Sequence, residues 1–151
     1  MKTIDKKATK ALRELIIINN DRYEGYKLAE QHTKDSDLKT LFTQLSLQSK
    51  GFRNELELHL ADMEDAPAVD ATKMSGKIYR GWMDIKDNLA ANTRKAVLSS
   101  CEFGEDEAKK TYESVLKDTE GLSNQMLDLI HRQKNELQKA HDHIKMLRDN
   151  A

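Results

Sequence analysis

Residues 4–31 read IDKKATKALRELIIINNDRYEGYKLAEQ, and apolar or small side chains recur in them at helical spacing. The spacing is sustained for about seven turns, which predicts a long amphipathic helix. The positions that carry it are Ile4, Ala8, Ala11, Leu15, Ile18, Tyr26 and Ala29. Because such a helix must bury its apolar stripe against other elements, this stretch favours a helical bundle.

Three further stretches show the same periodicity, so we predict an all-α chain. The expected helices span about 4–31, 37–64, 93–117 and 119–149, with a short amphipathic helix at about 77–88. Short connections make the first and last pairs antiparallel hairpins. The connection between the second and third helices is long enough to return along the bundle. One such crossover defines a ferritin-like four-helix bundle.

The composition agrees with a single helical domain over residues 1–151. The chain has 25 Lys and Arg and 26 Asp and Glu, a net charge of −1, one proline and six glycines. A nucleic-acid binder would usually carry a basic excess, and a many-turned β-sandwich would carry more turn residues. We therefore expect no nucleic-acid partner.

The chain shows no signal for secretion or membrane insertion. Its first residues, MKTIDKK, lack an apolar run, and no stretch approaches the length of a membrane span. The single cysteine, Cys101, cannot form an intramolecular disulfide. These features predict a cytoplasmic protein with no membrane partner.

Four motifs resemble an uncharacterised bacterial family of ferritin-like four-helix-bundle proteins. They are NDxxEGY at 20–26, RGWxDIK at 80–86, CExGED at 101–106 and HDxIxxLRD at 141–149. The resemblance covers nearly the whole chain. It implies a ferritin-like fold and a stress-related role, and it implies no particular activity.

Ferritin-like bundles are best known for two iron or manganese ions held between the helices. Such a site takes one Glu from each of two helices and a Glu-x-x-His pair from each of the others. The sequence contains no Glu-x-x-His, and the nearest pairs are Glu55 with His59, four residues apart, and Asp128 with His131, three residues apart. A metal centre would have to use Glu105 and Glu102, with Glu55 or Glu136 entering from the side.

Helical angles instead predict a mixed polar layer inside the bundle. At 100° per residue, Arg22 falls on the apolar stripe of the first helix, and Glu105 lies between inward residues of the third. The helix registers bring these residues level with neutral polar groups. The expected layer comprises Asn19, Arg22, Tyr26, Gln48, Glu105, Tyr112 and Gln133. A buried Glu is costly unless it is paired, and an arginine in the same layer would pair it and repel a divalent metal.

Two hypotheses follow from this layer. The favoured one is a non-enzymatic, stress-associated binding or structural module that forms a homo-oligomer and holds no cofactor. The alternative is a metal-binding protein, such as a di-iron carboxylate oxidoreductase or an iron-handling protein that uses iron or manganese. Its candidate ligands are Glu102, Glu105, Glu55, Glu136 and His59.

Glycines interrupt three of the expected helices, at Gly25, Gly51 and Gly104. Each costs about 1 kcal/mol relative to Ala in a helix interior. All three fall on the same flank of their apolar stripes. This placement predicts close backbone approach between helices, or under the crossover.

Overall fold

The computed structural model describes residues 3–63 and 93–151, and these residues form four helices with no strand among them. The helices are α1 (Thr3–His32), α2 (Ser36–Ala61), α4 (Arg94–Leu116) and α5 (Asn124–Asp149). For these residues, the prediction of an all-α chain with four long helices is confirmed. The short helix expected at about 77–88 lies outside the described residues.

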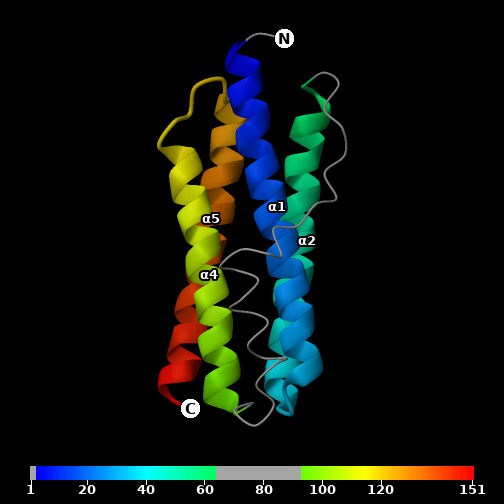
Figure 1. Cartoon of the computed structure of the whole chain (residues 1–151), viewed down its shortest axis with the longest axis vertical. Coiled ribbons are helices and arrows are strands. Elements are labelled where there is room, and N and C mark those ends of the chain that lie inside the picture. Colours follow the sequence, from blue (N-terminus) through cyan, green and yellow to red (C-terminus); the bar gives the residue numbers. More distant parts are fainter. Residues whose placement is uncertain (1–2, 64–92) are drawn as a thin grey trace.

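The helices pack side by side as a bundle of two hairpins (Figure 1). Helices α1 and α2 form one antiparallel hairpin, and α4 and α5 form the other. Helix α1 also packs on α4, and α2 makes a smaller contact with α5. Helices α2 and α4 run in the same direction, so each helix is antiparallel to both of its neighbours.

Side chains at the helix starts explain where α4 and α5 begin. The Thr93 hydroxyl accepts a hydrogen bond from the Ala96 amide, and the Ser123 hydroxyl accepts one from the Met126 amide, both at 3.2 Å. The prediction that the last helix starts at 119 was wrong. Gly121 has a φ of 85°, a left-handed conformation that breaks a helix, and the Ser123 cap then sets the start at Asn124.

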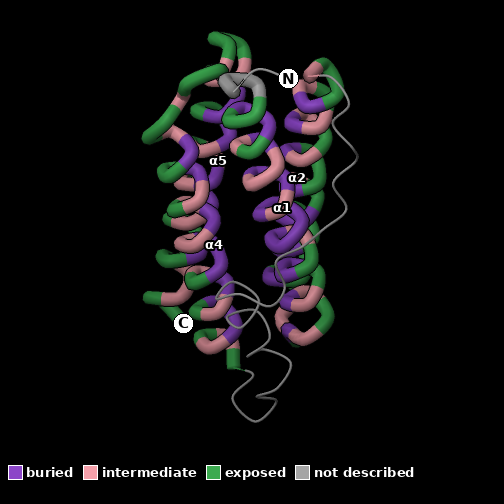
Figure 2. The backbone as a smooth tube through the Cα atoms, turned by 45° about the horizontal axis from the view of Figure 1, so that its top comes forward, coloured by how far each residue is buried: buried purple, intermediate pink, exposed green. Residues whose placement is uncertain are grey.

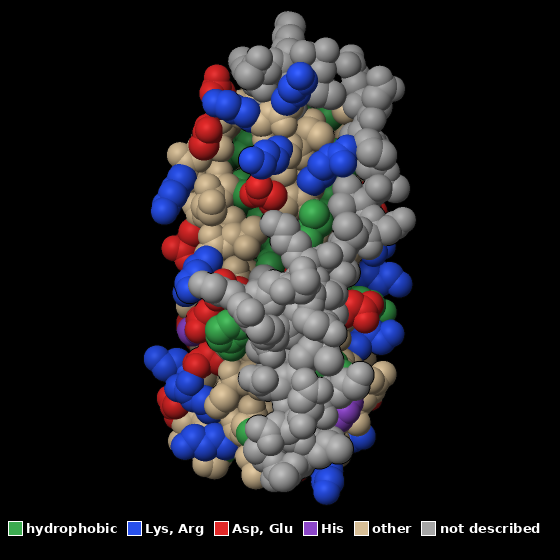
Figure 3. All heavy atoms as spheres, in the orientation of Figure 1, with side chains coloured by type: hydrophobic (Ala, Val, Ile, Leu, Met, Phe, Trp, Pro, Cys, Tyr) green, Lys and Arg blue, Asp and Glu red, His purple; other side chains and the backbone are tan. Residues whose placement is uncertain are grey.

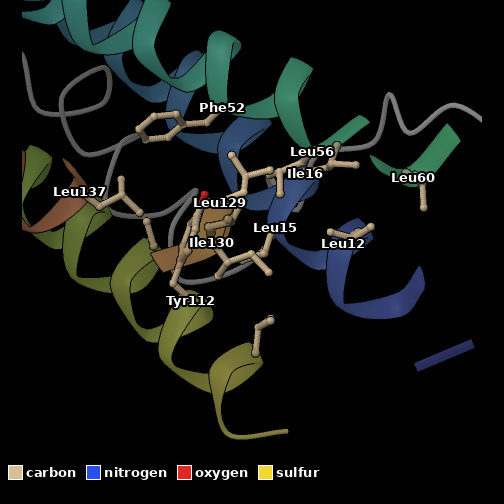
Figure 4. Packing of buried hydrophobic residues seen from close by; sticks show 13 residues of the cluster. Leu12, Leu15, Ile16, Phe52, Leu56, Leu60, Tyr112, Leu129, Ile130 and Leu137 are labelled. Atoms are coloured by element: carbon tan, nitrogen blue, oxygen red, sulfur yellow. The ribbon is translucent and has the colours of Figure 1, made fainter. Parts of the chain in front are cut away.

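The buried side chains form two apolar clusters, one towards each end of the bundle, as the purple inner faces in Figure 2 indicate. In the first cluster, Leu12, Leu15 and Ile16 of α1 lie close to Leu56 of α2 and Ile130 of α5 (Figure 4). The second cluster contains Tyr26, Ala29, Leu38, Phe42, Leu45, Val97, Leu98, Cys101, Ala140 and Ile144. The residues between the two clusters are polar.

Charged side chains of both signs are interspersed over the surface that Figure 3 shows. Some of them join the ends of the helices. Lys7 of α1 contacts Glu120 in the connection after α4, at 2.9 Å, and Arg94 at the start of α4 contacts Asp37 at 2.8 Å. None of the helices in the described parts of the chain is long and apolar enough to cross a membrane.

The prediction of close backbone approach was wrong at Gly51. This residue is exposed, and a Cβ added to it would meet nothing within 4 Å. Gly25 and Gly104 are buried, and for them close approach stays a prediction. At Gly51 the glycine therefore lowers helix stability without serving the packing among residues 3–63 and 93–151.

We predict that Gly51→Ala stabilises the protein. Alanine should raise the free energy of unfolding by about 0.5 to 1 kcal/mol, because it lowers the entropy cost of the helix and meets no neighbour. Urea unfolding of dilute protein measures the change. The neighbouring exposed Lys50→Ala, with a helix propensity close to that of alanine, serves as the control and should change little. A loss of stability in Gly51→Ala would contradict the prediction.

Candidate functional site

The centre of the bundle holds a buried ion pair between Arg22 of α1 and Glu105 of α4. The two side chains are 1% and 0% exposed. The guanidinium donates through Nε to Oε1 of Glu105, and through Nη2 to Oε2 at 3.1 Å. This two-point contact fixes the orientation of both groups as well as their separation.

The remaining donors of Arg22 reach across to α2. Its Nη1 donates to the Ser49 hydroxyl at 2.9 Å, and its Nη2 donates to Oε1 of Gln48 at 2.8 Å. The guanidinium also lies 5.3 Å from the centre of the Tyr26 ring, within range of a cation–π interaction. One side chain of α1 therefore bonds to both helices that pack against it.

A second buried network lies about one turn away and reaches α5. Asn19 Nδ2 donates to the Tyr112 hydroxyl at 2.8 Å, and that hydroxyl donates to Gln133 Oε1 at 2.7 Å. Gln133 Nε2 then donates to the backbone carbonyl of Phe52 at 3.1 Å. The chain of bonds passes from α1 through α4 and α5 to α2, so all four helices share it.

Burial dominates the electrostatics of the layer. For Arg22, burial is the largest single effect and opposes the charge, but the charge and hydrogen bond of Glu105, together with Tyr26 and Tyr112, raise the pKa above its ordinary value. Burial, together with the negative charge of Glu105, raises the pKa of Tyr26 and of the Cys101 thiol well above their ordinary values. Burial likewise raises the pKa of Tyr112. The layer thus holds one compensated charge pair among groups that stay neutral.

The other candidate metal ligands also contact basic side chains. Glu102 is paired with Arg148 of α5, and Arg132 of α5 donates to Glu55 Oε2 at 2.6 Å. Glu136 lies 3.2 Å from the ammonium of Lys139. His59 is half-buried near the end of α2. The four candidate carboxylates therefore lie in separate ion pairs.

This donor set does not fit a di-metal centre. Iron and manganese sites of this class need several carboxylate and imidazole groups that converge from different helices. Within residues 3–63 and 93–151, no group of three or more His, Cys, Asp or Glu side chains could hold a metal ion. Glu105 is also held at both oxygens by Arg22, so a metal would have to displace a buried guanidinium.

The helical angles did not identify every buried polar residue. Asn20 and Asp21 are 5% and 0% exposed, although both lie off the stripe centred on Leu15. Arg53 Nη1 donates to Asn20 Oδ1 at 3.3 Å. The continuous apolar run at 15–18 was the available signal, because apolar residues on every face indicate a helix buried on more than one side.

A cross-helix contact of His141 was also missed. Its Nε2 lies 2.7 Å from Asp106 Oδ1 on α4, and its Nδ1 lies 3.1 Å from Asp142. Together with the pair of Glu102 and Arg148, this contact ties the last turns of α5 to α4. Residues of α4 and α5 far apart in sequence make these contacts, so the sequence alone did not indicate them.

The fold and the layer define an antiparallel four-helix bundle with a buried Arg–Glu ion pair. Residues 7–118 match a protein family described as "Domain of unknown function (DUF2383)", and the chain belongs to this family. The matched residues include Arg22, Ser49 and Glu105, and α5 lies beyond them. No curated protein and no solved structure matches the chain.

We predict strong coupling between Arg22 and Glu105. Arg22→Met or Glu105→Leu alone should lower the free energy of unfolding by about 3 to 5 kcal/mol, because each leaves a buried charge unpaired. The double variant should recover most of that loss, since an apolar pair of similar volume has no charge to desolvate. Urea unfolding of the four proteins gives the coupling energy as a double-mutant cycle.

The exposed pair of Lys7 and Glu120 is the matched control for this cycle. Lys7→Met and Glu120→Leu should show coupling near zero, because water screens exposed charges. Additive losses for Arg22→Met and Glu105→Leu would contradict a clamp formed by the ion pair.

We predict that alkaline pH destabilises the protein. Cys101, Tyr26 and Tyr112 have folded pKa values raised above the ordinary 9.0 of a thiol and 10.0 of a phenol. The unfolded chain therefore releases these protons first, and stability that is complete below pH 9.0 is lost as the pH rises further. Each group contributes a slope of up to about 1.4 kcal/mol per pH unit.

Tyr112→Phe tests the assignment, because it removes one of these groups and should reduce the slope of unfolding free energy against pH above 10.0. The half-buried Tyr23→Phe is the control. Equal slopes in wild type and Tyr112→Phe would contradict the prediction.

Proposed function

We propose that the protein is a non-enzymatic binding or structural module, a ferritin-like bundle that acts in the cytoplasm through self-association. The observation that carries the non-enzymatic, structural part of the proposal is the buried pair of Arg22 and Glu105. The stress-associated part of the proposal rests on the resemblance of the four sequence motifs.

The state of the buried polar groups supports a structural role for the layer. Catalytic groups must reach a substrate, and a general acid or base needs a pKa near the working pH. Arg22, Glu105 and Tyr112 are at most 1% exposed, and each is hydrogen-bonded to another helix. The Cys101 thiol is buried with a raised pKa, whereas a reactive cysteine needs exposure and a lowered pKa.

The metal-binding alternative would require the layer to rearrange. Arg22 would have to leave Glu105, and Arg148 would have to leave Glu102, before either carboxylate could bind an ion. Arg22 would then need another partner, because an unpaired buried charge costs several kcal/mol, whereas the partly exposed Arg148 would keep its contact with Asp149. The ion pairs therefore favour the structural role over metal chemistry.

Metal analysis tests the proposal. The protein is purified without a histidine tag from cells grown with added iron and manganese, and its metal content is measured by mass spectrometry. We expect well under one ion per chain, and we expect the same melting temperature with and without a chelator. The reason is that the candidate carboxylates already have basic partners.

The matched variant is Glu105→Gln, which retains the shape of the side chain and removes its charge. Stoichiometric iron or manganese in the wild type that is lost in Glu105→Gln would overturn the proposal in favour of the metal-binding alternative. Metal that is retained in Glu105→Gln and lost in a His59→Ala variant would also overturn it, with a different ligand set.

A further inference from the structure

The outward side of α2 carries little charge from position 40 onward. We define the α2 outer face as the exposed residues of this helix from position 40 onward. They are Thr40, Thr43, Gln44, Leu47, Lys50, Gly51, Asn54, Leu58 and Ala61. Lys50 is the charged member of this set. Figure 2 shows this face as the continuous exposed edge of α2.

The corresponding residues of α1 show the contrast. From position 6 to the end of α1, the exposed residues are Lys6, Lys7, Lys10, Glu24, Lys27 and Gln31, and all but Gln31 are charged. Depletion of charge, and not bulk hydrophobicity, is what distinguishes the centre of a protein interface from other surface. The α2 outer face therefore has the composition of an interface.

Two large apolar side chains lie along the middle of this face. Leu47 and Leu58 are 60% and 72% exposed. Eleven residues separate them, so they lie within about 20° of each other around the helix and about 16 Å apart along it. Gly51 lies between them in open space. In an antiparallel pair of such faces each leucine can meet a leucine of the other copy, and the missing side chain of Gly51 lets the two helices approach each other between these contacts.

We propose that the α2 outer face binds the α2 outer face of a second copy of this chain, with the two helices antiparallel. This proposal rests on the self-association proposed above and names its surface. The two-fold axis passes near residues 52 and 53 of both copies. Leu47 of one copy then lies level with Leu58 of the other, and Gly51 lies level with Asn54.

Charge complementarity supports the antiparallel orientation. Lys50 and the half-buried Glu57 are seven residues apart and lie on one flank of the face, where Glu57 also lies 3.7 Å from Arg53 of its own helix. In a two-fold antiparallel pair the same flanks of the two helices meet, so Lys50 of each copy lies beside Glu57 of the other. A parallel pair would instead bring opposite flanks of the two helices together, so Lys50 would not meet Glu57 of the other copy.

The size of the face indicates weak and reversible association. It is one helix wide, which corresponds to the low end of specific interfaces, below about 1,200 Å² of total buried area. An isologous two-fold contact also closes on itself, so association stops at the dimer. We therefore expect an equilibrium between monomer and dimer that depends on concentration.

Light scattering of the whole chain across a wide concentration range tests the surface. We expect the wild-type mass to rise from one chain towards two. Leu47→Glu combined with Leu58→Glu should raise the dissociation constant at least about tenfold, because four charges would face an apolar contact. Met146→Glu is the matched control, since Met146 is a 48% exposed apolar residue on α5, and it should leave the mass unchanged. Circular dichroism verifies that all variants stay helical.

The outcomes separate this proposal from the proposed function. A wild type that stays a single chain at every concentration would overturn both. A wild type that associates, with a double variant that associates equally well, would overturn the α2 surface and leave self-association standing. Loss of association in Met146→Glu alone would also overturn the α2 surface.

Single cysteines test the orientation. In the proposed dimer the Asn54 positions of the two copies lie about 4 to 5 Å apart along the helix axis, and the Thr40 positions lie about 37 Å apart. A short bismaleimide should therefore cross-link Asn54→Cys and not Thr40→Cys, and Cys101 is buried. Cross-links in both variants would indicate a parallel pair and overturn the proposal. Cross-links in neither variant, or in Thr40→Cys alone, would also overturn it.

Discussion

The ion pair between Arg22 and Glu105 is the constraint on which the arrangement of the bundle depends. Two buried charges are tolerated only when each meets the other and the remaining donors are bonded. That requirement sets the register of α1 against α4, and the bonds from Arg22 to Ser49 and Gln48 set the register of α1 against α2. The pair also lies between the two apolar clusters. A helix that shifted along its neighbour would move a charged group into an apolar cluster, which is unfavourable.

Because of this constraint, the buried polar groups bond to one another and are not available to outside partners. Inside the bundle, Asn19, Tyr112 and Gln133 form a chain of hydrogen bonds. Glu105 is paired with the guanidinium of Arg22. Nearer the surface, Glu102 and Glu55 have the basic partners Arg148 and Arg132 of α5. Because the buried polar groups are used in contacts between the helices, the bundle must bind partners through its outer faces. The α2 outer face, with its low charge, is the surface that we propose for self-association.

Much of the fold and part of the layer follow from the sequence. The apolar periodicity predicted four helices, and helical angles placed Arg22, Glu105 and Gln133 inward, where the structure has them buried. The start of α5 was misplaced because a positive φ at Gly121 is a property of the folded backbone. The space around Gly51 and the burial of Asp21 depend on which helices cover which faces, and periodicity along one helix does not contain that information.

The sequence by itself determined that this chain forms long amphipathic helices and that an arginine and a glutamate lie on their inward sides. These are local properties, because 3.6 residues per turn assign each side chain to a face. Only the tertiary structure decided that Arg22 meets Glu105 at both oxygens, that Arg148 pairs with Glu102, and that His141 reaches Asp106. Those contacts join different helices, and their partners are chosen by the rotation and axial shift of each helix within the packed bundle.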